Sequence, residues 1–167
     1  MGISIVNRLD SISRFINTFL AKIAGISLLL IIFLVVGNAV SRVIYEPFLG
    51  TTELAGWLCA ITIAFGLGYT QITKGYVDID ALHQHFPRSI RKIIDCSVLF
   101  ISMVFYAVVA WQIGLYSLKV ATNGNLSETL QLPFYPLIFL LVIGFLGLSL
   151  ALLVDLLKQL SGGTKIG

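Results

Sequence analysis

The chain of 167 residues is 57% hydrophobic and only 11% charged, with a mean hydropathy of +0.97 and a formal net charge of +3. A water-soluble domain of this length needs charged side chains at roughly a quarter of its positions, so the composition excludes a soluble protein and indicates an integral membrane protein. The small positive charge fits contacts with anionic lipid, and nucleic acid is not needed as a partner to explain it.

Four windows without charged residues are long enough to cross a bilayer, which takes about 20 apolar residues in a helix. They predict spans over about 23–41, 54–73, 96–118 and 133–154. The alternation of a membrane β-barrel is absent from them, so we expect an all-α integral membrane protein with four transmembrane helices in a single domain over 1–167. The alternative of a cleaved signal peptide is disfavoured, because the first apolar core exceeds the usual length of roughly 7–15 residues.

The basic residues are distributed unevenly between the two sides of these spans. Nine of the eleven lysines and arginines lie in the N-terminal arm, in the loop between spans two and three, or in the tail over 155–167. The other two connections contain only Arg42 and Lys119. The positive-inside rule therefore predicts that both termini are cytoplasmic.

Two amphipathic segments flank the predicted spans. Over 1–22, apolar residues recur at steps of three and four from Ile5 to Leu20, which predicts an amphipathic helix that lies in the inner membrane interface and is separate from span one. The cytoplasmic loop over 75–94 shows the same pattern up to Pro87, which cannot continue a helix. We expect a second, short interfacial helix there.

Span two has a stripe of small residues at every fourth position, which places them on one face of the helix. Such stripes allow helix backbones to approach closely in lipid, where no hydrophobic force draws helices together. The stripe could face the protein's own bundle, which is the more common use, or a second protein. Its members are Gly56, Ala60, Ala64 and Gly68.

The spans lack the side chains on which most membrane chemistry depends. None of the four apolar cores contains an ionisable residue, so a proton-coupled path of the chain's own is not expected. His83 and His85 both lie in the cytoplasmic loop and point in different directions on a helix, so they cannot jointly hold a metal ion. No pairing of a nucleophile with a base is evident. We therefore predict a protein that is not an enzyme and has neither a metal site nor a cofactor.

Polar side chains instead gather at the predicted outer end of spans one and two. Asn38 and Arg42 are four residues apart and share a helix face, and Glu53 stands near the positive N-terminal end of span two. They could serve internal contacts, with Glu53 as a helix cap, or they could contact a soluble partner outside the membrane. The residues alone leave both interpretations open.

Several motifs occur in a fixed order between Asn38 and Pro136: Asn38 and Arg42 at the end of span one, a short outer loop to Glu53, KGYVDIDAL after span two, HFPRSIRK, and GNLSETLQLP before span four. In this order they resemble the small four-helix membrane subunit, the Q-type or DctQ-like subunit, of tripartite ATP-independent periplasmic (TRAP) transporters. Lys74, Gly75 and Asp80 match the motif after span two, and Ser127 lies in the last one. Tyr76 departs from the family, which usually has a histidine there, and a single acid at Glu53 replaces a common pair.

The resemblance implies a function in the bacterial inner membrane. Such subunits work beside a large transport subunit, here expected as a separate chain, which carries the sodium-coupled path. A periplasmic substrate-binding protein delivers an organic acid of the dicarboxylate or sialic acid type. We expect this chain to brace the large subunit, with Asn38, Arg42, Glu53 and Ser127 contributing to contacts at the outer face. Two alternatives stay open: a membrane anchor for an electron-transfer or signalling partner, and a self-sufficient small oligomeric transporter.

Overall fold

The computed structural model describes residues 2–44, 46, 48–75 and 88–161. In these residues it contains four α-helices, each long and apolar enough to cross a membrane: α1 (Gly2–Ile44), α2 (Thr51–Ile72), α4 (Arg88–Asn123) and α5 (Tyr135–Leu160). The described part of the chain has no β-strand, apart from one isolated bridge between Leu126 and Pro133. The predicted all-α membrane fold with four spans is confirmed.

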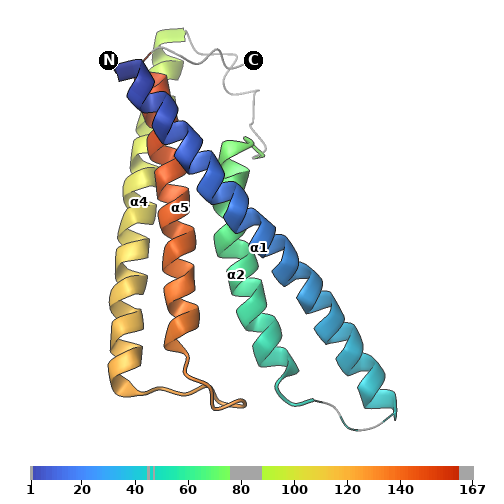
Figure 1. The fold of residues 1–167 in the computed structure, drawn as a ribbon. Coiled ribbons are helices and arrows are strands. Elements are labelled where there is room, and N and C mark those ends of the chain that lie inside the picture. The colour runs from blue at the N-terminus through green and yellow to red at the C-terminus, as the bar shows by residue number, and fades with distance from the viewer. Residues whose placement is uncertain (1, 45, 47, 76–87, 162–167) are drawn as a thin grey trace.

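The helices are arranged around α5. It packs against α4 on one side and against α2 on the other, and α1 packs mainly on α2. Figure 1 shows that α1 also runs obliquely across α5, near the end that holds the N-terminus. The connections from α1 to α2 and from α4 to α5 lie at the opposite end (Figure 1), which is the predicted outer side. Because α5 touches all three neighbours, it has the largest set of buried residues, from Leu137 to Val154.

The structure differs from the expectation of a separate amphipathic helix over 1–22. Helix α1 is unbroken for 43 residues, or about 64 Å at 1.5 Å per residue, which is about twice the thickness of the hydrocarbon core. The reason is that the buried face of the helix continues across the expected boundary without a change of register. Its members recur at steps of three and four: Ser13, Asn17, Leu20, Ala24 and Ser27.

The predicted cytoplasmic loop over 75–94 is only partly described. Residues 76–87, including Asp80 and both histidines, lie outside the described residues, and the part from Arg88 onward belongs to α4. Helices α4 and α5 are longer than the windows predicted for their spans, α4 at both ends and α5 at its C-terminal end. A window without charges marks the crossing of the hydrocarbon core, and a helix can continue beyond it into the headgroups with charged side chains. Gly75 closes α2 by donating its N–H to the Thr70 carbonyl oxygen at 2.9 Å, directly after Lys74, whose φ is 50°.

The small-residue stripe of α2 has two halves with different surroundings. Ala64 and Gly68 are buried in the bundle. A Cβ atom added at Gly144 of α5 would lie 2.6 Å from the Ala64 carbonyl oxygen, so these two backbones are in direct contact. Ala60 is half-buried, and Gly56 is exposed with nothing within 4 Å of the position of a Cβ atom. The inner half of the stripe therefore packs within the chain, and the outer half is open.

Candidate functional site

Glu53 lies in the first turn of α2, where its negative charge is favoured by the helix N-terminus. It does not cap its own helix. Its Oε2 accepts hydrogen bonds from the backbone N–H groups of Thr129, at 3.1 Å, and Leu130, at 3.2 Å, in the loop between α4 and α5. The Ser127 side chain, together with these two amides, holds the pKa of the Glu53 carboxyl below its usual value. Glu53 therefore fastens the outer loop of one half of the chain to the helix start of the other half.

The same loop is held in shape by Ser127. The Ser127 N–H donates to the Leu132 carbonyl oxygen at 2.9 Å, and the Leu132 N–H donates to the Ser127 Oγ at 3.3 Å. Gly124, with φ of 65°, and Gln131, with φ of 55°, adopt the left-handed conformation and turn the chain before and after Ser127. Ser127 is consequently only 7% exposed, so its side chain orders the loop and presents little surface to a partner.

Asn38 and Arg42 share a face of α1, but they have different surroundings. The Asn38 Oδ1 accepts a hydrogen bond from the Phe48 N–H at 2.9 Å, which fixes the connection from α1 to α2. Arg42 is exposed, and no described residue forms an ion pair or hydrogen bond with it. The structure thus brings Glu53 and Ser127 together, and Arg42 has no partner among the described residues at the predicted outer end of α1.

A recess of about 590 Å³ adjoins Glu53, and its wall comes from α2, α4 and the loop between α4 and α5, with Leu49 from the connection to α1. The Trp57 and Phe134 rings meet edge to face in its wall, with centroids 5.6 Å apart. Glu128 and Asn125 add polar groups to the lining. Asn38 and Arg42 do not line it. This mixture of carboxylates, an amide and aromatic rings suits contact with a polar protein surface.

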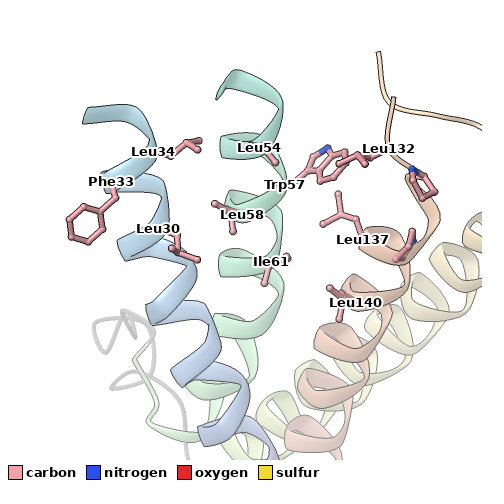
Figure 2. Close-up of a pocket in the computed structure, with 12 residues that line it drawn as sticks. Leu30, Phe33, Leu34, Leu54, Trp57, Leu58, Ile61, Leu132, Leu137 and Leu140 are labelled. Atoms are coloured by element: carbon pink, nitrogen blue, oxygen red, sulfur yellow. The ribbon is translucent and has the colours of Figure 1, made fainter. Parts of the chain in front are cut away.

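A second cavity of about 650 Å³ is a cleft between α1, α2 and α5 in the outer half of the molecule (Figure 2). Its lining is apolar throughout, with Leu30 and Leu34 from α1, Leu58 from α2 and Leu140 from α5 among its members. Trp57 belongs to both cavities and stands between them. An apolar cleft offers no group that would recognise a charged solute, so the chemistry of this space is that of acyl chains or apolar side chains.

One central residue was missed in the sequence. Asn17 is completely buried where α1 crosses α2 and α5. Its Nδ2 donates to the carbonyl oxygens of Ser13, at 3.0 Å, and Gly147, at 3.1 Å. Its Oδ1 has no conventional donor among the described residues, but it lies against Gly68, where a Cβ atom would collide with it. The available signal is the spacing of four between Ser13 and Asn17, which lie in the segment predicted to form an interfacial helix.

Polar pairs join α5 to every other helix at the inner end. Lys158 forms an ion pair with Asp10 of α1 at 2.6 Å, and Asp10 also pairs with Arg14 at 3.1 Å. The Gln71 Nε2 of α2 donates to Asp155 at 2.8 Å. The Gln159 Nε2 of α5 donates to the Asp95 Oδ2 of α4 at 3.3 Å. Among the described residues, no group of three histidine, cysteine or acidic side chains could hold a metal ion.

A family model described as "Tripartite ATP-independent periplasmic transporters, DctQ component" matches residues 31–162, well over half of the chain. The chain belongs to the DctQ family. The resemblance inferred from the sequence is thereby confirmed, and the protein is a multi-pass membrane component of a TRAP transporter. No curated protein and no solved structure matches the chain.

The match to the DctQ family covers some of the residues described above and not others. Arg42, Glu53 and Ser127 lie within the matched residues, as do the inner-end partners on α5. Asn17 and Asp10 precede the match, although the residues that they contact, Gly147 and Lys158, fall inside it. DctQ proteins are transporter components and not an enzyme family, in line with a site built from hydrogen bonds that fasten loops and helices.

The contacts of Glu53 lead to a testable expectation. Glu53→Gln keeps the size of the side chain but removes the charge that strengthens its bonds to the two backbone amides. We expect hydrogen exchange at the Thr129 and Leu130 amides to become several-fold faster, while the helices stay protected. Glu46→Gln is the matched control, because Glu46 is exposed on the same outer side. Equal exchange in both variants would show that the carboxylate does not hold the loop.

Proposed function

We propose that this DctQ protein is the small scaffold subunit of a sodium-coupled, binding-protein-dependent secondary transporter for organic acids of the dicarboxylate or sialic acid type. In this role it braces a separate large membrane subunit and helps to dock the periplasmic substrate-binding protein. The family match over residues 31–162 is the observation that carries the proposal. The cytoplasmic location of both termini, proposed from the distribution of basic residues, places the Glu53 loop in the periplasm.

The described helices support the role of a brace rather than of a transport path. Their acidic residues lie toward the helix ends, where Asp155 and Asp95 hydrogen-bond to glutamines and Glu53 binds the outer loop. The larger of the two cavities is apolar. A transport path needs polar or charged groups inside the membrane, or helices that are broken at mid-depth. Four continuous helices joined through α5 form a broad and fixed surface instead.

Co-purification tests the proposal. The chain is co-expressed with the proposed large subunit and extracted in mild detergent. We expect both chains in one complex, which retains the binding protein when substrate is present. Migration of this chain alone, with no large subunit retained, would contradict the scaffold role.

Docking at the outer face leads to a second expectation, on Arg42. An exposed charge at the rim of an interface acts mainly through the association rate and its dependence on salt. Arg42→Ala should therefore lower uptake several-fold at low ionic strength and leave membrane insertion unchanged. Lys22→Ala is the control, because it removes the same charge from the inner part of the same helix. Uptake at the wild-type level in Arg42→Ala would remove Arg42 from the docking surface.

A further inference from the structure

The asparagine and glutamine side chains within the helices differ in whether they hydrogen-bond to another segment of the chain. Four of them hydrogen-bond to another segment of the chain: Asn17, Asn38, Gln71 and Gln159. Asn7, Asn123 and Gln112 do not, and of these three only Gln112 of α4 lies inside a predicted span. It is exposed, and it forms no hydrogen bond with any residue that the structure describes. A long amide side chain on the outside of a membrane helix needs an explanation.

The predicted span over 96–118 places Gln112 in the hydrocarbon core, away from water and lipid headgroups. Gln112 precedes Lys119, the nearest charged residue toward the outer side, by seven positions, or about 10 Å along the helix axis. That distance exceeds the length of its side chain. Acyl chains offer neither donors nor acceptors, and an amide without partners is costly in the hydrocarbon core. The missing partner is therefore a hydrogen-bonding group inside the membrane, which only another polypeptide provides.

The residues around Gln112 on α4 indicate that this polypeptide is a helix. Exposed residues recur along this face of α4 at steps of three and four, which is the spacing that packs one helix along another. A single polar residue within such a helix–helix contact determines which helix binds and in which register the two helices pack. The face consists of Val98, Ile101, Phe105, Val108, Gln112 and Tyr116, and its apolar members and Tyr116 are all more than half exposed. The buried residues of α4, Ala110, Ser117 and Val120, lie on another side of the helix.

We propose that this face of α4 packs against a transmembrane helix of the large subunit, and that Gln112 hydrogen-bonds to a polar group of that helix. The inference rests on the proposed scaffold function and assigns the surface that performs it. A periplasmic binding protein cannot reach this depth, and DctQ proteins are components of a multi-subunit transporter. The large subunit is the membrane-spanning partner that this composition supplies.

Photo-cross-linking in the full complex tests the assignment. A photoreactive phenylalanine analogue replaces Phe105 on the α4 face, or Phe33 on α1 as the matched control, which is 74% exposed and belongs to a different face. We expect a covalent product with the large subunit from position 105 and none from position 33. The variant Gln112→Leu should retain several-fold less large subunit during detergent washes, and Gln112→Asn should restore part of the retention.

The outcomes separate this inference from the function on which it rests. A complex that co-purifies but cross-links from position 33 and not from position 105 would overturn the assigned face and leave the scaffold function intact. Cross-links from position 105 to a second copy of this chain would do the same. Absence of the large subunit from the purified material would overturn the scaffold function and this inference together.

Discussion

Gly144→Ala should lower the free energy of unfolding by about 1–3 kcal/mol, the usual effect of overpacking a tight interior. The added Cβ atom would lie 2.6 Å from the Ala64 carbonyl oxygen and 2.8 Å from its carbonyl carbon. Both are backbone atoms of α2, so the methyl group cannot be accommodated by the rotation of a side chain. The two helices must move apart, and the contact that places α2 on α5 is weakened.

Thermal unfolding in a fixed detergent measures this effect, and Gly66→Ala is the control. Nothing lies within 4 Å of the position of a Cβ atom at Gly66, and alanine favours a helix over glycine by about 1 kcal/mol. We therefore expect Gly66→Ala to unfold at the wild-type temperature or slightly above it, and Gly144→Ala several degrees below. Equal unfolding temperatures for the two variants would show that α2 and α5 do not approach as closely as described.

Asn17→Ala should also destabilise the bundle, by about 1–2 kcal/mol, the size of interhelical hydrogen bonds in membranes. The substitution removes the donor to the Gly147 carbonyl oxygen, a hydrogen bond that joins α1 to α5. It also empties the space against Gly68. Because Asn17 is completely buried, no water replaces the lost contacts.

Asn7→Ala is the matched control for this variant, since Asn7 is an exposed residue of the same helix. We expect Asn7→Ala to unfold like the wild type. Proteolysis adds a second readout, because weakening the junction should make the N-terminal part of α1 more accessible to protease. If Asn17→Ala and Asn7→Ala unfold at the same temperature, the crossing of α1 depends on apolar packing alone.

The four spans could be predicted from the sequence because the lipid environment restricts where charged residues can lie. Charged residues cannot remain in the hydrocarbon core, so runs without them mark the crossings. The continuity of α1 was not predictable from the same rule. A period of three and four residues describes both a helix lying on the membrane and a helix packed against others, and Leu20 fits either description. The choice depends on what faces the segment, namely Gly68 and Gly147, which are distant in sequence.

Glu53 and Arg42 show a similar limit for the candidate site. The sequence placed Glu53 at the start of a helix, where it suggested a cap. Its actual donors are backbone amides at Thr129 and Leu130, and backbone amides have no signature in the sequence. Asn38 and Arg42 share a face by their spacing, yet Asn38 accepts a hydrogen bond within the chain, whereas Arg42 has no partner in the part of the chain that the structure describes. Spacing predicts which side chains share a helix face. The conformation of the loops between helices determines which of those side chains form hydrogen bonds.

Uptake into liposomes tests most directly whether this chain serves a companion that contains the transport path. The purified chain, the large subunit, and the two together are reconstituted with the binding protein, an inward sodium gradient, and a radiolabelled dicarboxylate or sialic acid. The scaffold function predicts uptake only where both membrane chains are present, and none above empty liposomes for this chain alone. Sodium-driven uptake by this chain without the large subunit would contradict it.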